Sequence, residues 1–482
     1  MTEELTSGQS GSSPRSSAMH YTSADKPLPQ IARELNVDGI IEGSVQRSGN
    51  KVRVTAQLIH GPTDTHLWAE SYERDLEDIL SLQDEVSRDV ANQVKLRLTP
   101  EEQARLSSCA TVPPEAYESY LQGRYYWNMR TEEGLNKSVA FFRDAIDKDP
   151  EYARAYAGLG LSYVVMSGYN LISKDQAFTP AKTAALQALE LDDGVAAAHL
   201  AMAVVYVEGD GNPGGGEEEL KRAIELDPNY ASAHQMYGEC LSLWRRHAEA
   251  DAQMKRALEL DPLSVAANTW YSGVLHNAGR DDEAIAQLQK SLRVAGNVPI
   301  THFWLGRRYL DKKMHRESVD EFRTAVTLSR EQPFYVAWLG YAYAVSGQTD
   351  VAGKLLKQLT TSPARSYVPA YEVAVLAATL GHQDQALQWL QRACDDRRLF
   401  WKVRRRQNRS GVRQHAFRAR VRGGCTPRGT TAVTPPAGSS SPRFACGGPT
   451  KSLETLCLPF TLRLYNPRRA ATGGDRPFCV LF

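Results

Sequence analysis

Two spacings of hydrophobic residues follow one another along the chain and predict two structural units. Between residues 52 and 58 every second residue is apolar, as in a strand with one buried face. Gly49-Asn50 stands between this run and the segment 39–48, and such a pair is typical of a two-residue hairpin turn. The segment THLWAESYERD is expected to add a third strand.

Helical spacing flanks these predicted strands. PLPQIARELNV places Ile31, Leu35 and Val37 on one side after two prolines, which predicts a short amphipathic helix. Apolar residues recur at helical intervals from about Leu76 to Val94 and predict a longer helix. The sequence therefore predicts a small α+β unit whose helices cover one face of the sheet.

From Pro114 onward the pattern is helical and periodic. RALELDP at 256–262 repeats RAIELDP at 222–228 with an offset of 34 residues. Small residues at positions 8 and 20 and large ones at 7, 11 and 24 recur in blocks of 34 that start at residues 197, 231, 265, 299, 333 and 367. Small residues let two helices approach, and a proline at position 32 ends the second helix. With earlier units at 115 and 153, about eight antiparallel helical hairpins are expected over residues 112–398.

This block pattern resembles the tetratricopeptide repeat. The resemblance implies a mainly α protein, an α-solenoid in which the first helices of the hairpins line a concave groove. The segment KPLPQIARELNVDGIIEGSVQRSGNKVRVTAQLI also resembles the second half of the TolB amino-terminal-like domain. In bacterial signalling proteins that domain commonly precedes such arrays, and a winged-helix DNA-binding domain, a Ser/Thr kinase or a nucleotide cyclase lies further upstream.

The start of the chain departs from that family pattern. Residues 1–25 are rich in Ser and Gly and are expected to be a flexible lead, and residues 26–100 to be a partial TolB amino-terminal-like α+β domain. Family members have one more strand and helix before this point. The resemblance therefore implies a chain that is truncated at its start and that has lost an effector domain.

Charge is distributed unequally over the 482 residues. Residues 1–396 hold 39 Lys and Arg against 54 Asp and Glu, whereas residues 397–482 hold 18 against 2. The segment 397–422 has ten arginines and one lysine, and it is the only feature that favours a nucleic-acid partner. The Arg, Pro, Gly, Ser and Cys enrichment up to residue 482 is also typical of an out-of-frame translation of GC-rich coding sequence, which is the favoured interpretation. Residues 399–482 are expected to be a basic, low-order tail.

Membrane and export signals are weak in this sequence. The longest uncharged, mostly apolar run, Val195 to Val207, covers 13 residues, whereas a membrane span needs about 20. The first residues include acids and no apolar stretch, unlike a secretory signal, and the cysteines form no CxxC pair. A cytoplasmic protein without a membrane span is predicted, with an extracytoplasmic place in a membrane-anchored parent protein as the alternative.

Two motifs suggest ligand chemistry and are interpreted as structural. GDGNPG at 209–214 matches G-x-G-x-x-G but falls between the two helices of one block, without the strand–helix–strand context of a dinucleotide site. His199 and His234 lie on first helices of adjacent repeats, with no acid or Cys at ligand spacing, which favours groove or core positions over a metal pair. No G-x-S-x-G or H-E-x-x-H motif is present. The sequence predicts no catalytic residue, no cofactor and no metal.

The resemblance also implies which residues face the groove. In tetratricopeptide arrays these are positions 2, 5, 9, 12 and 13, and in the blocks at 299 and 333 they include Phe303, Arg307, Phe334 and Tyr341. The Lys and Asn of a chaperone-type carboxylate clamp are missing from the blocks at 231, 299 and 333. These four residues are therefore predicted to hold a peptide or protein partner on a non-enzymatic scaffold.

Two alternatives stay open at this point. Phe303 and Tyr341 can be explained equally well as side chains that pack between repeats. The chain is also compatible with the sensory portion of a bacterial transcriptional regulator or Ser/Thr kinase whose effector domain is missing. The identity of the partner and the oligomeric state do not follow from the sequence.

Overall fold

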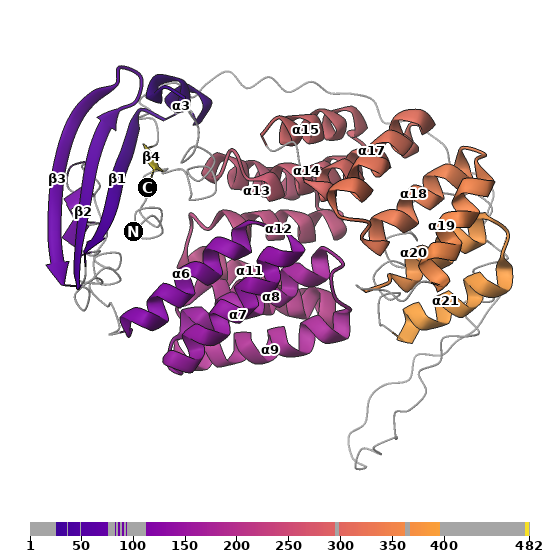
Figure 1. Cartoon of the computed structure of the whole chain (residues 1–482), viewed down its shortest axis with the longest axis horizontal. Helices are drawn as coiled ribbons and strands as arrows, with labels where there is room; N and C mark the ends of the chain where they lie inside the picture. Colours follow the sequence, from indigo (N-terminus) through magenta and orange to yellow (C-terminus); the bar gives the residue numbers. More distant parts are fainter. Residues whose placement is uncertain are drawn as a thin grey trace, which may run out of the picture. The chain divides into compact units, whose positions relative to one another are not determined.

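The computed structural model describes two kinds of structure, strands near the start of the chain and paired helices after them (Figure 1). The described residues are 26–35, 37–48, 50–75, single positions between 82 and 93, 112–294, 298–361, 367–395 and 478–481.

The predicted hairpin and third strand are confirmed. β1 (Gly39–Ser48), β2 (Lys51–His60) and β3 (Thr65–Asp75) form an antiparallel sheet, with Ser48 opposite Lys51 across a two-residue turn. Burial alternates along β2 from residue 51 to residue 58, where residues 52, 54, 56 and 58 are buried and those between them are more exposed, and Ile59 is buried as well. The alternation in the sequence therefore marks the covered face of the sheet, as expected for period two.

Helical residues cover that face. Leu82, Val86 and Val90 are helical, spaced one turn apart, and pack in one buried cluster with β2 residues and Tyr72 of β3. The Tyr72 hydroxyl donates a hydrogen bond to Asp89 over 2.8 Å, which ties the sheet to this helical segment.

The short helix α3 (Leu28–Leu35) forms where it is predicted, and its buried Ile31, Ala32 and Leu35 pack in a separate cluster with Ile40. Ile40 and Ile41 are consecutive in β1 and point to opposite faces, and Ile41 belongs to the cluster of the first face. The expectation that both helices cover one face is therefore wrong.

A fourth strand comes from the far end of the chain. β4 (Phe478–Leu481) pairs in parallel with β1, so the strand order is β3-β2-β1-β4. These residues lie within the segment that is expected to be a low-order tail, and residues 396–477 and 482 are outside the described part of the chain. The edge of β1 is therefore paired over four residues, Gly39 to Glu42.

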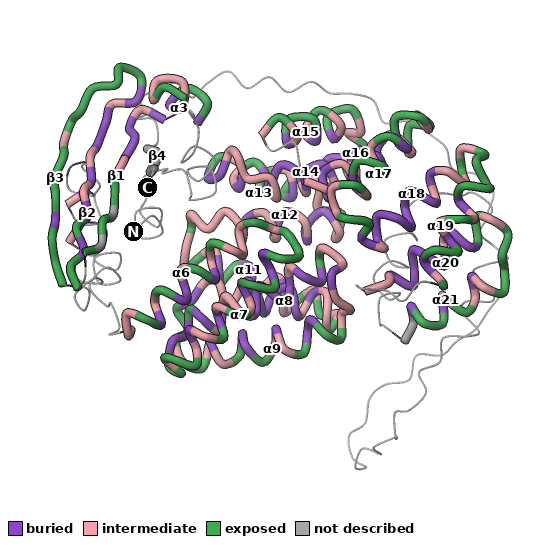
Figure 2. Tube along the Cα trace, in the orientation of Figure 1, coloured by how far each residue is buried: buried purple, intermediate pink, exposed green. Residues whose placement is uncertain are grey.

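Eight helical hairpins are present within the described residues 112–395 (Figure 1), here called repeats one to eight. The array begins near the predicted residue 112, and each hairpin buries the sides on which its helices face one another (Figure 2). The helix pairs are α6 (Pro114–Asn128) and α7 (Glu132–Lys148), α8 (Ala153–Gly168) and α9 (Lys174–Leu191), α10 (Ala196–Val204) and α11 (Pro213–Leu226), α12 (Ala231–Leu243) and α13 (His247–Leu260), α14 (Val265–Asn277) and α15 (Asp281–Val294), α16 (Pro299–Asp311) and α17 (His315–Leu328), α18 (Pro333–Val345) and α19 (Thr349–Thr361), α20 (Ala370–Thr379) and α21 (Gln383–Asp395).

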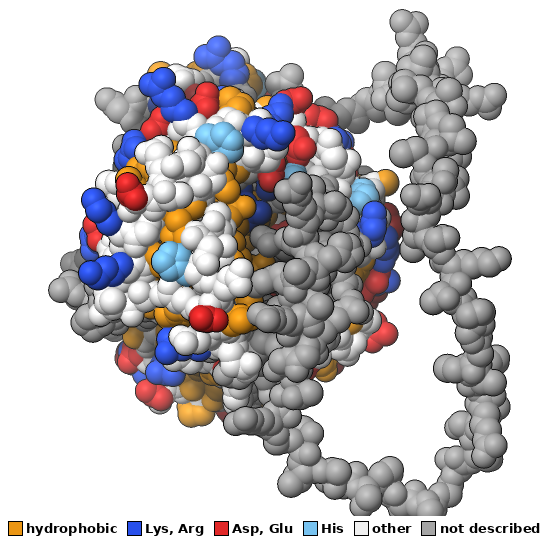
Figure 3. Space-filling view, turned by 90° about the vertical axis from the view of Figure 1, so that its right-hand side faces the viewer, with side chains coloured by type: hydrophobic (Ala, Val, Ile, Leu, Met, Phe, Trp, Pro, Cys, Tyr) orange, Lys and Arg blue, Asp and Glu red, His pale blue; other side chains and the backbone are white. Residues whose placement is uncertain are grey.

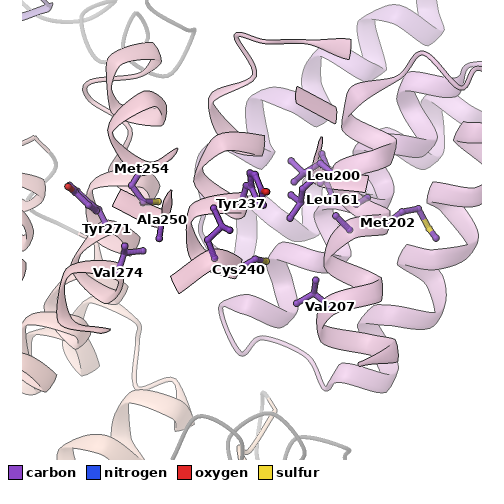
Figure 4. Packing of buried hydrophobic residues seen from close by; sticks show 14 of the residues in the cluster. Leu161, Leu200, Met202, Val207, Tyr237, Cys240, Ala250, Met254, Tyr271 and Val274 are labelled. Carbon is purple, nitrogen blue, oxygen red and sulfur yellow. The ribbon is translucent and has the colours of Figure 1, made fainter. Parts of the chain in front are cut away.

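The packing rule inferred from the blocks holds in the structure. A Cβ atom added to Gly238 would lie 2.8 Å from Cγ of Met254, and one added to Gly306 would lie 3.2 Å from the Phe322 ring. Only a residue without a side chain allows such an approach of two helices. Large residues at position 24 then fill the space, so the core continues from one repeat to the next, as Figure 4 shows for the cluster that includes Met254.

The third hairpin contains one residue more than each of repeats four, five and six. α10 continues into a π-helical turn, η2 (Val205–Asp210), before α11 begins. In repeats four, five and six the fourth residue of the first helix bonds to a residue 19 positions later, whereas His199 of repeat three bonds to Glu219, 20 positions later. A π-helical turn accommodates the additional residue. The first helix of this repeat therefore begins at 196 rather than at the predicted block start of 197, while its second helix keeps the period.

Candidate partner-binding surface

The four residues predicted to contact a partner lie on neighbouring first helices. Phe303 and Arg307 belong to α16, and Phe334 and Tyr341 belong to α18. The rings of Phe303 and Phe334 are 4.8 Å apart, within the range of a favourable aromatic pair. The structure thus brings together the residues that the sequence places 31 positions apart, because the two helices belong to adjacent repeats.

The two phenylalanines are interior residues. Phe303 is 3% exposed and Phe334 is 5% exposed, and both belong to the core cluster that joins repeats six and seven. Phe303 also contacts the rings of Phe322, Tyr335 and Trp338. Burial of this kind is what the packing alternative predicts for Phe303. Arg307 and Tyr341 keep an intermediate exposure, at the border of the same cluster.

Trp338 completes this arrangement and was not selected by the sequence analysis. The Arg307 guanidinium carbon lies 4.1 Å from the centroid of the Trp338 ring, close enough for a cation–π interaction. Tyr341 forms an edge-on pair with the same Trp338 ring, with centroids 5.4 Å apart. The arginine is therefore held in one orientation by an aromatic surface, and its position is set by the packing of two repeats.

The 34-residue spacing of the tryptophans in the sequence could have identified Trp338. Trp270, Trp304 and Trp338 are each the sixth residue of a first helix, 34 residues apart, and the rings of Trp270 and Trp304 are 5.5 Å apart. Arg308 lies 5.9 Å from the Trp304 ring and pairs with Asp311 at 3.1 Å. Two consecutive arginines of α16 therefore contact tryptophans of two successive repeats.

Apolar side chains also gather on the face at the end of the array. Figure 3 views the side of the later repeats, and in its coloured part hydrophobic side chains form a band with Lys, Arg, Asp and Glu at the margins. An apolar strip bordered by charge is typical of a surface that contacts other macromolecules.

His199 and His234, the two histidines considered as a metal pair, make their side-chain hydrogen bonds in separate repeats. The Nδ1 atom of His199 lies 2.6 Å from the Glu219 carboxylate, and its Nε2 lies 2.9 Å from the Asp193 carbonyl oxygen. His234 makes the equivalent contacts with Gln253 and with the Pro228 carbonyl. Each histidine connects the start of its repeat with its own second helix, and among the described residues no group of His, Cys, Asp and Glu is arranged to hold a metal ion.

GDGNPG forms the turn of the third hairpin. Gly211 adopts a left-handed conformation with φ of 68°, which a glycine accepts without strain. Asn212 caps α11 by accepting a hydrogen bond from the Gly215 amide over 3.1 Å, and Pro213 occupies the first turn. The segment is flanked by helices on both sides, so it lacks the preceding strand of a dinucleotide-binding motif.

Polar contacts of fixed spacing join the middle repeats. The Glu217 carboxylate of α11 accepts hydrogen bonds from the Tyr237 hydroxyl at 2.8 Å and from Arg246 at 2.7 Å. One repeat later, Asp251 accepts from Tyr271 at 2.7 Å and from Arg280 at 2.6 Å. All three positions advance by 34 residues. We call each set of three a polar joint.

The polar joints shift the pKa of their carboxyl groups. Burial alone would raise the pKa of Glu217, but the hydrogen bonds from Arg246, Tyr237 and Lys221 together lower it to about 2. Burial acts in the same way on Asp251, whose pKa is likewise lowered by Lys255, Tyr271 and Arg280. Both carboxylates are therefore stabilised in the charged form by their neighbours.

Comparison with known proteins agrees with the repeat pattern. Residues 245–299 match the family model of the tetratricopeptide repeat. These residues include α13, α14 and α15, and with them the polar joint of Asp251, Tyr271 and Arg280. The array is a tetratricopeptide α-solenoid. Among the described residues, no helix is long and apolar enough to cross a membrane.

One curated relative shares part of the sequence. A protein of Rhizobium meliloti (strain 1021), by its name a putative adenylate cyclase, is 33% identical over 192 residues, which is 39% of this chain. The match spans only 32% of the length of that protein.

Solved structures with similar helices include Pseudomonas aeruginosa PilF, at 22% identity and a TM-score of 0.34, covering 44% of this chain and 94% of PilF. Yeast Tom70 is 16% identical with a TM-score of 0.42, covering 64% of this chain and 67% of Tom70. A thermophilic TPR protein of Thermus thermophilus is 18% identical with a TM-score of 0.34, covering 40% of this chain and 99% of that protein.

Proposed function

We propose that this chain is a non-enzymatic scaffold that holds a peptide or protein partner on the first helices of repeats six and seven. The observation that supports the proposal is Arg307, which lies over Trp338 while remaining partly exposed beside Tyr341. Arginine, tyrosine and tryptophan dominate the energetics of protein interfaces when they are held rigidly. Here the buried rings of Phe303 and Phe334 supply that rigidity.

The roles of the four predicted residues divide accordingly. Arg307 and Tyr341 contact the partner, whereas Phe303 and Phe334 support them from the core of the array. Replacing Phe303 by Ala is therefore expected to destabilise the array as well as weaken binding, because its side chain contacts four other rings besides Trp304. A test of binding alone must use the two accessible residues.

The test begins with peptides selected against the full chain from a random display library. The affinity of a selected peptide is then measured by calorimetry for the wild type, Arg307→Gln and Tyr341→Ala. Each change is expected to weaken binding by about tenfold or more, as for an interface hot spot. Arg316→Gln on α17, an exposed arginine that is not on a first helix, is the matched control. Unchanged affinity in both variants would refute the assignment.

A second function is favoured by the relative from Rhizobium meliloti. The shared region covers 32% of that protein, which is named a putative adenylate cyclase, and under this proposal the chain regulates the activity of a nucleotide cyclase. The test is to add the full chain to the Rhizobium meliloti relative and to measure cyclic nucleotide formation. A change in rate that Arg307→Gln abolishes supports this function, and an unchanged rate argues for the scaffold alone.

A further inference from the structure

The turn between the two helices of repeat two is longer than the equivalent turns of later repeats. It comprises the five residues 169–173. In repeats four to seven three residues join the two helices, at 244–246, 278–280, 312–314 and 346–348. Leu171 is buried and packs with Leu135 and Met166 of the first two repeats, which fixes the middle of the longer turn. The packing of one hairpin does not require the two additional residues.

This turn contacts a repeat that is distant in the sequence. Gln332 is the residue that precedes α18, and its side-chain amide donates hydrogen bonds to the carbonyl oxygens of Tyr169 at 3.4 Å and Asn170 at 3.3 Å. The ring of Tyr169 packs against the core cluster that joins repeats six and seven, and also against the cluster of Leu171. Repeats two and seven therefore touch although 163 positions separate Gln332 from Tyr169.

Tyr335 of repeat seven extends the aromatic cluster toward this turn. The third residue of the first helix is small in repeats four, five and six, where it is Ala233, Ala267 and Thr301. In repeat seven it is Tyr335, whose ring lies 5.2 Å from that of Phe334. Burial raises the pKa of the Tyr335 hydroxyl, and the nearby Tyr169 adds to the rise. A large ring at an otherwise small position thus lies near the ring of repeat two.

The contact between repeats two and seven is weak and is not needed to build the array. N–H···O hydrogen bonds usually measure about 2.7–3.2 Å, so both bonds from Gln332 are long. Tetratricopeptide arrays are stabilised by contacts between neighbouring repeats, and repeats two and seven are not neighbours. Tyr169 also keeps an intermediate exposure. Another molecule that offers the same groups can therefore take the place of this turn.

We propose that the turn 169–173 is an internal ligand of repeats six and seven, and that a peptide partner with an aromatic residue displaces it. The inference rests on the proposed function, that the first helices of these repeats bind a peptide, and it adds the chemistry of the peptide and the regulation of the site. The aromatic side chain of the peptide replaces Tyr169 on the cluster, and its backbone carbonyls accept the hydrogen bonds from Gln332. Tyr341 lies at the border of the same cluster and Arg307 lies over Trp338, so both are within the same surface.

An internal ligand reduces the affinity for an external one. The peptide binds only the fraction of molecules in which the turn is released, so its apparent affinity falls by that fraction. Removal of the Tyr169 ring weakens the internal ligand and leaves Arg307, Tyr341 and Gln332 in place. The affinity for the peptide should therefore rise in such a variant, whereas loss of a residue that contacts the peptide lowers it.

Calorimetry on the full chain tests this inference. The probe is a peptide selected against the full chain from a random display library, and the proteins are the wild type, Tyr169→Ala and Tyr169→Phe. We expect Tyr169→Ala to bind the peptide more tightly by about fivefold or more, and Tyr169→Phe, which keeps the ring, to resemble the wild type. The matched control is Tyr156→Ala, which removes another partly exposed tyrosine of repeat two that packs in a different cluster, and its affinity should not change.

Two further measurements use the wild-type chain. The amides of Tyr169, Asn170 and Leu171 are hydrogen-bonded within the turn, and their hydrogen exchange should accelerate when the peptide saturates the protein, because the released turn opens more often. Replacing the aromatic residue of the selected peptide by Ala should weaken binding by about tenfold. Exchange in the wild type decides the question if Tyr169→Ala fails to fold, which circular dichroism checks.

The outcomes separate this inference from the proposed function. Unchanged or weaker binding by Tyr169→Ala, an equal gain in Tyr156→Ala, or exchange of the turn that is unchanged or slower with peptide would each overturn the internal ligand. Binding that does not depend on the aromatic residue of the peptide would overturn it as well. In all these cases a loss of affinity in Arg307→Gln and Tyr341→Ala leaves the proposed function in place. The reverse result, a gain in Tyr169→Ala with no loss in those two variants, refutes the proposed contact residues and supports the internal ligand.

Discussion

The contacts between adjacent repeats are polar in repeats three to five and aromatic in repeats six and seven. Between repeats three, four and five, a carboxylate of one second helix accepts hydrogen bonds from a tyrosine and an arginine of the next repeat. In repeats five, six and seven the carboxylate and the tyrosine are replaced by apolar residues, Ile285 with Leu305 and Val319 with Leu339. Aromatic rings pack around the second of these pairs. The 34-residue period therefore constrains the shape of the contact between repeats, whereas the chemistry of that contact can vary.

The difference has a physical consequence. A joint made from hydrogen bonds to a carboxylate depends on the charge of that carboxylate, whereas a joint made from buried rings does not. The middle of the array should therefore respond to acid, and repeats six and seven should respond to loss of volume. Local stability can be compared by amide hydrogen exchange of the separate helices, because repeat arrays open in parts.

The largest effect is expected from Phe322→Ala in the aromatic joint. Phe322 is fully buried and contacts both Phe303 and Trp338, so its removal leaves a cavity that costs about 3–5 kcal/mol. Exchange of α16, α17 and α18 should accelerate strongly, by a factor that is the same at about pH 7 and about pH 4. Acceleration that spreads equally to α12 and α13 would show that the joints are not independent.

Glu217→Gln is expected to have the next largest effect, and the effect should depend on pH. The wild-type carboxyl has a pKa lowered from 4.5 to about 2, so it stabilises the folded state above pH 4.5 and ceases to do so as the pH falls toward 2. Above that window the variant should lose about 1.5–3 kcal/mol, the worth of hydrogen bonds to a charged group. Thermal melts from neutral to acid pH should show the two proteins converging. A constant difference would contradict a charged joint.

Tyr271→Phe removes the hydroxyl that donates a hydrogen bond to Asp251, with almost no change in side-chain volume and none in charge. Asp251 keeps its contacts with Arg280 and Lys255, so the loss is expected to be about 1 kcal/mol. Tyr237→Phe is the matched change at the other polar joint and should cost a similar amount. The measurement is the thermal midpoint together with exchange of α13 and α14, and no loss in either variant would mean that arginine alone maintains the joints.

The smallest effect concerns the turns, where the two regions should behave alike. Arg245 and Lys313 have φ values of 65° and 62°, while the equivalent residues of repeats five and seven are Gly279 and Gly347. A side chain in this left-handed conformation costs about 1 kcal/mol, so Arg245→Gly and Lys313→Gly are each expected to raise stability by somewhat less than that. Gly347→Ala should lower it. If Arg245→Gly and Lys313→Gly changed stability in opposite directions, the chemistry of the contacts between repeats would also affect the turns.

Local patterns were enough to predict much of this molecule. The alternation in residues 52–58 and the Gly49-Asn50 turn correctly indicated the hairpin, because strand pairing across a two-residue turn involves neighbours in sequence. The recurrence of small and large residues correctly indicated the hairpins around Gly238 and Gly306, because each glycine meets a side chain of its own repeat. The TolB resemblance of residues 26–100 stays a prediction.

The candidate site was only partly predictable. Phe303 and Arg307 sit four residues apart on one helix and look alike as groove positions, yet Phe303 is buried and Arg307 is partly exposed. What separates them is the placement of α18, which brings Phe334 to 4.8 Å from Phe303 and Trp338 under Arg307. The angle between successive hairpins decides this, and it does not follow from the residues of one helix.

By itself the sequence determined the repeating unit, because helix periodicity, glycine spacing and proline stops act over a few turns of chain. Tertiary structure decided what lies between units: the polar joints, the contacts of the tryptophans at 34-residue spacing, the additional π-helical residue of repeat three and the pairing of β4 with β1. These contacts join residues from about twenty to more than four hundred positions apart. Their geometry depends on how whole elements dock, and only the folded chain fixes that.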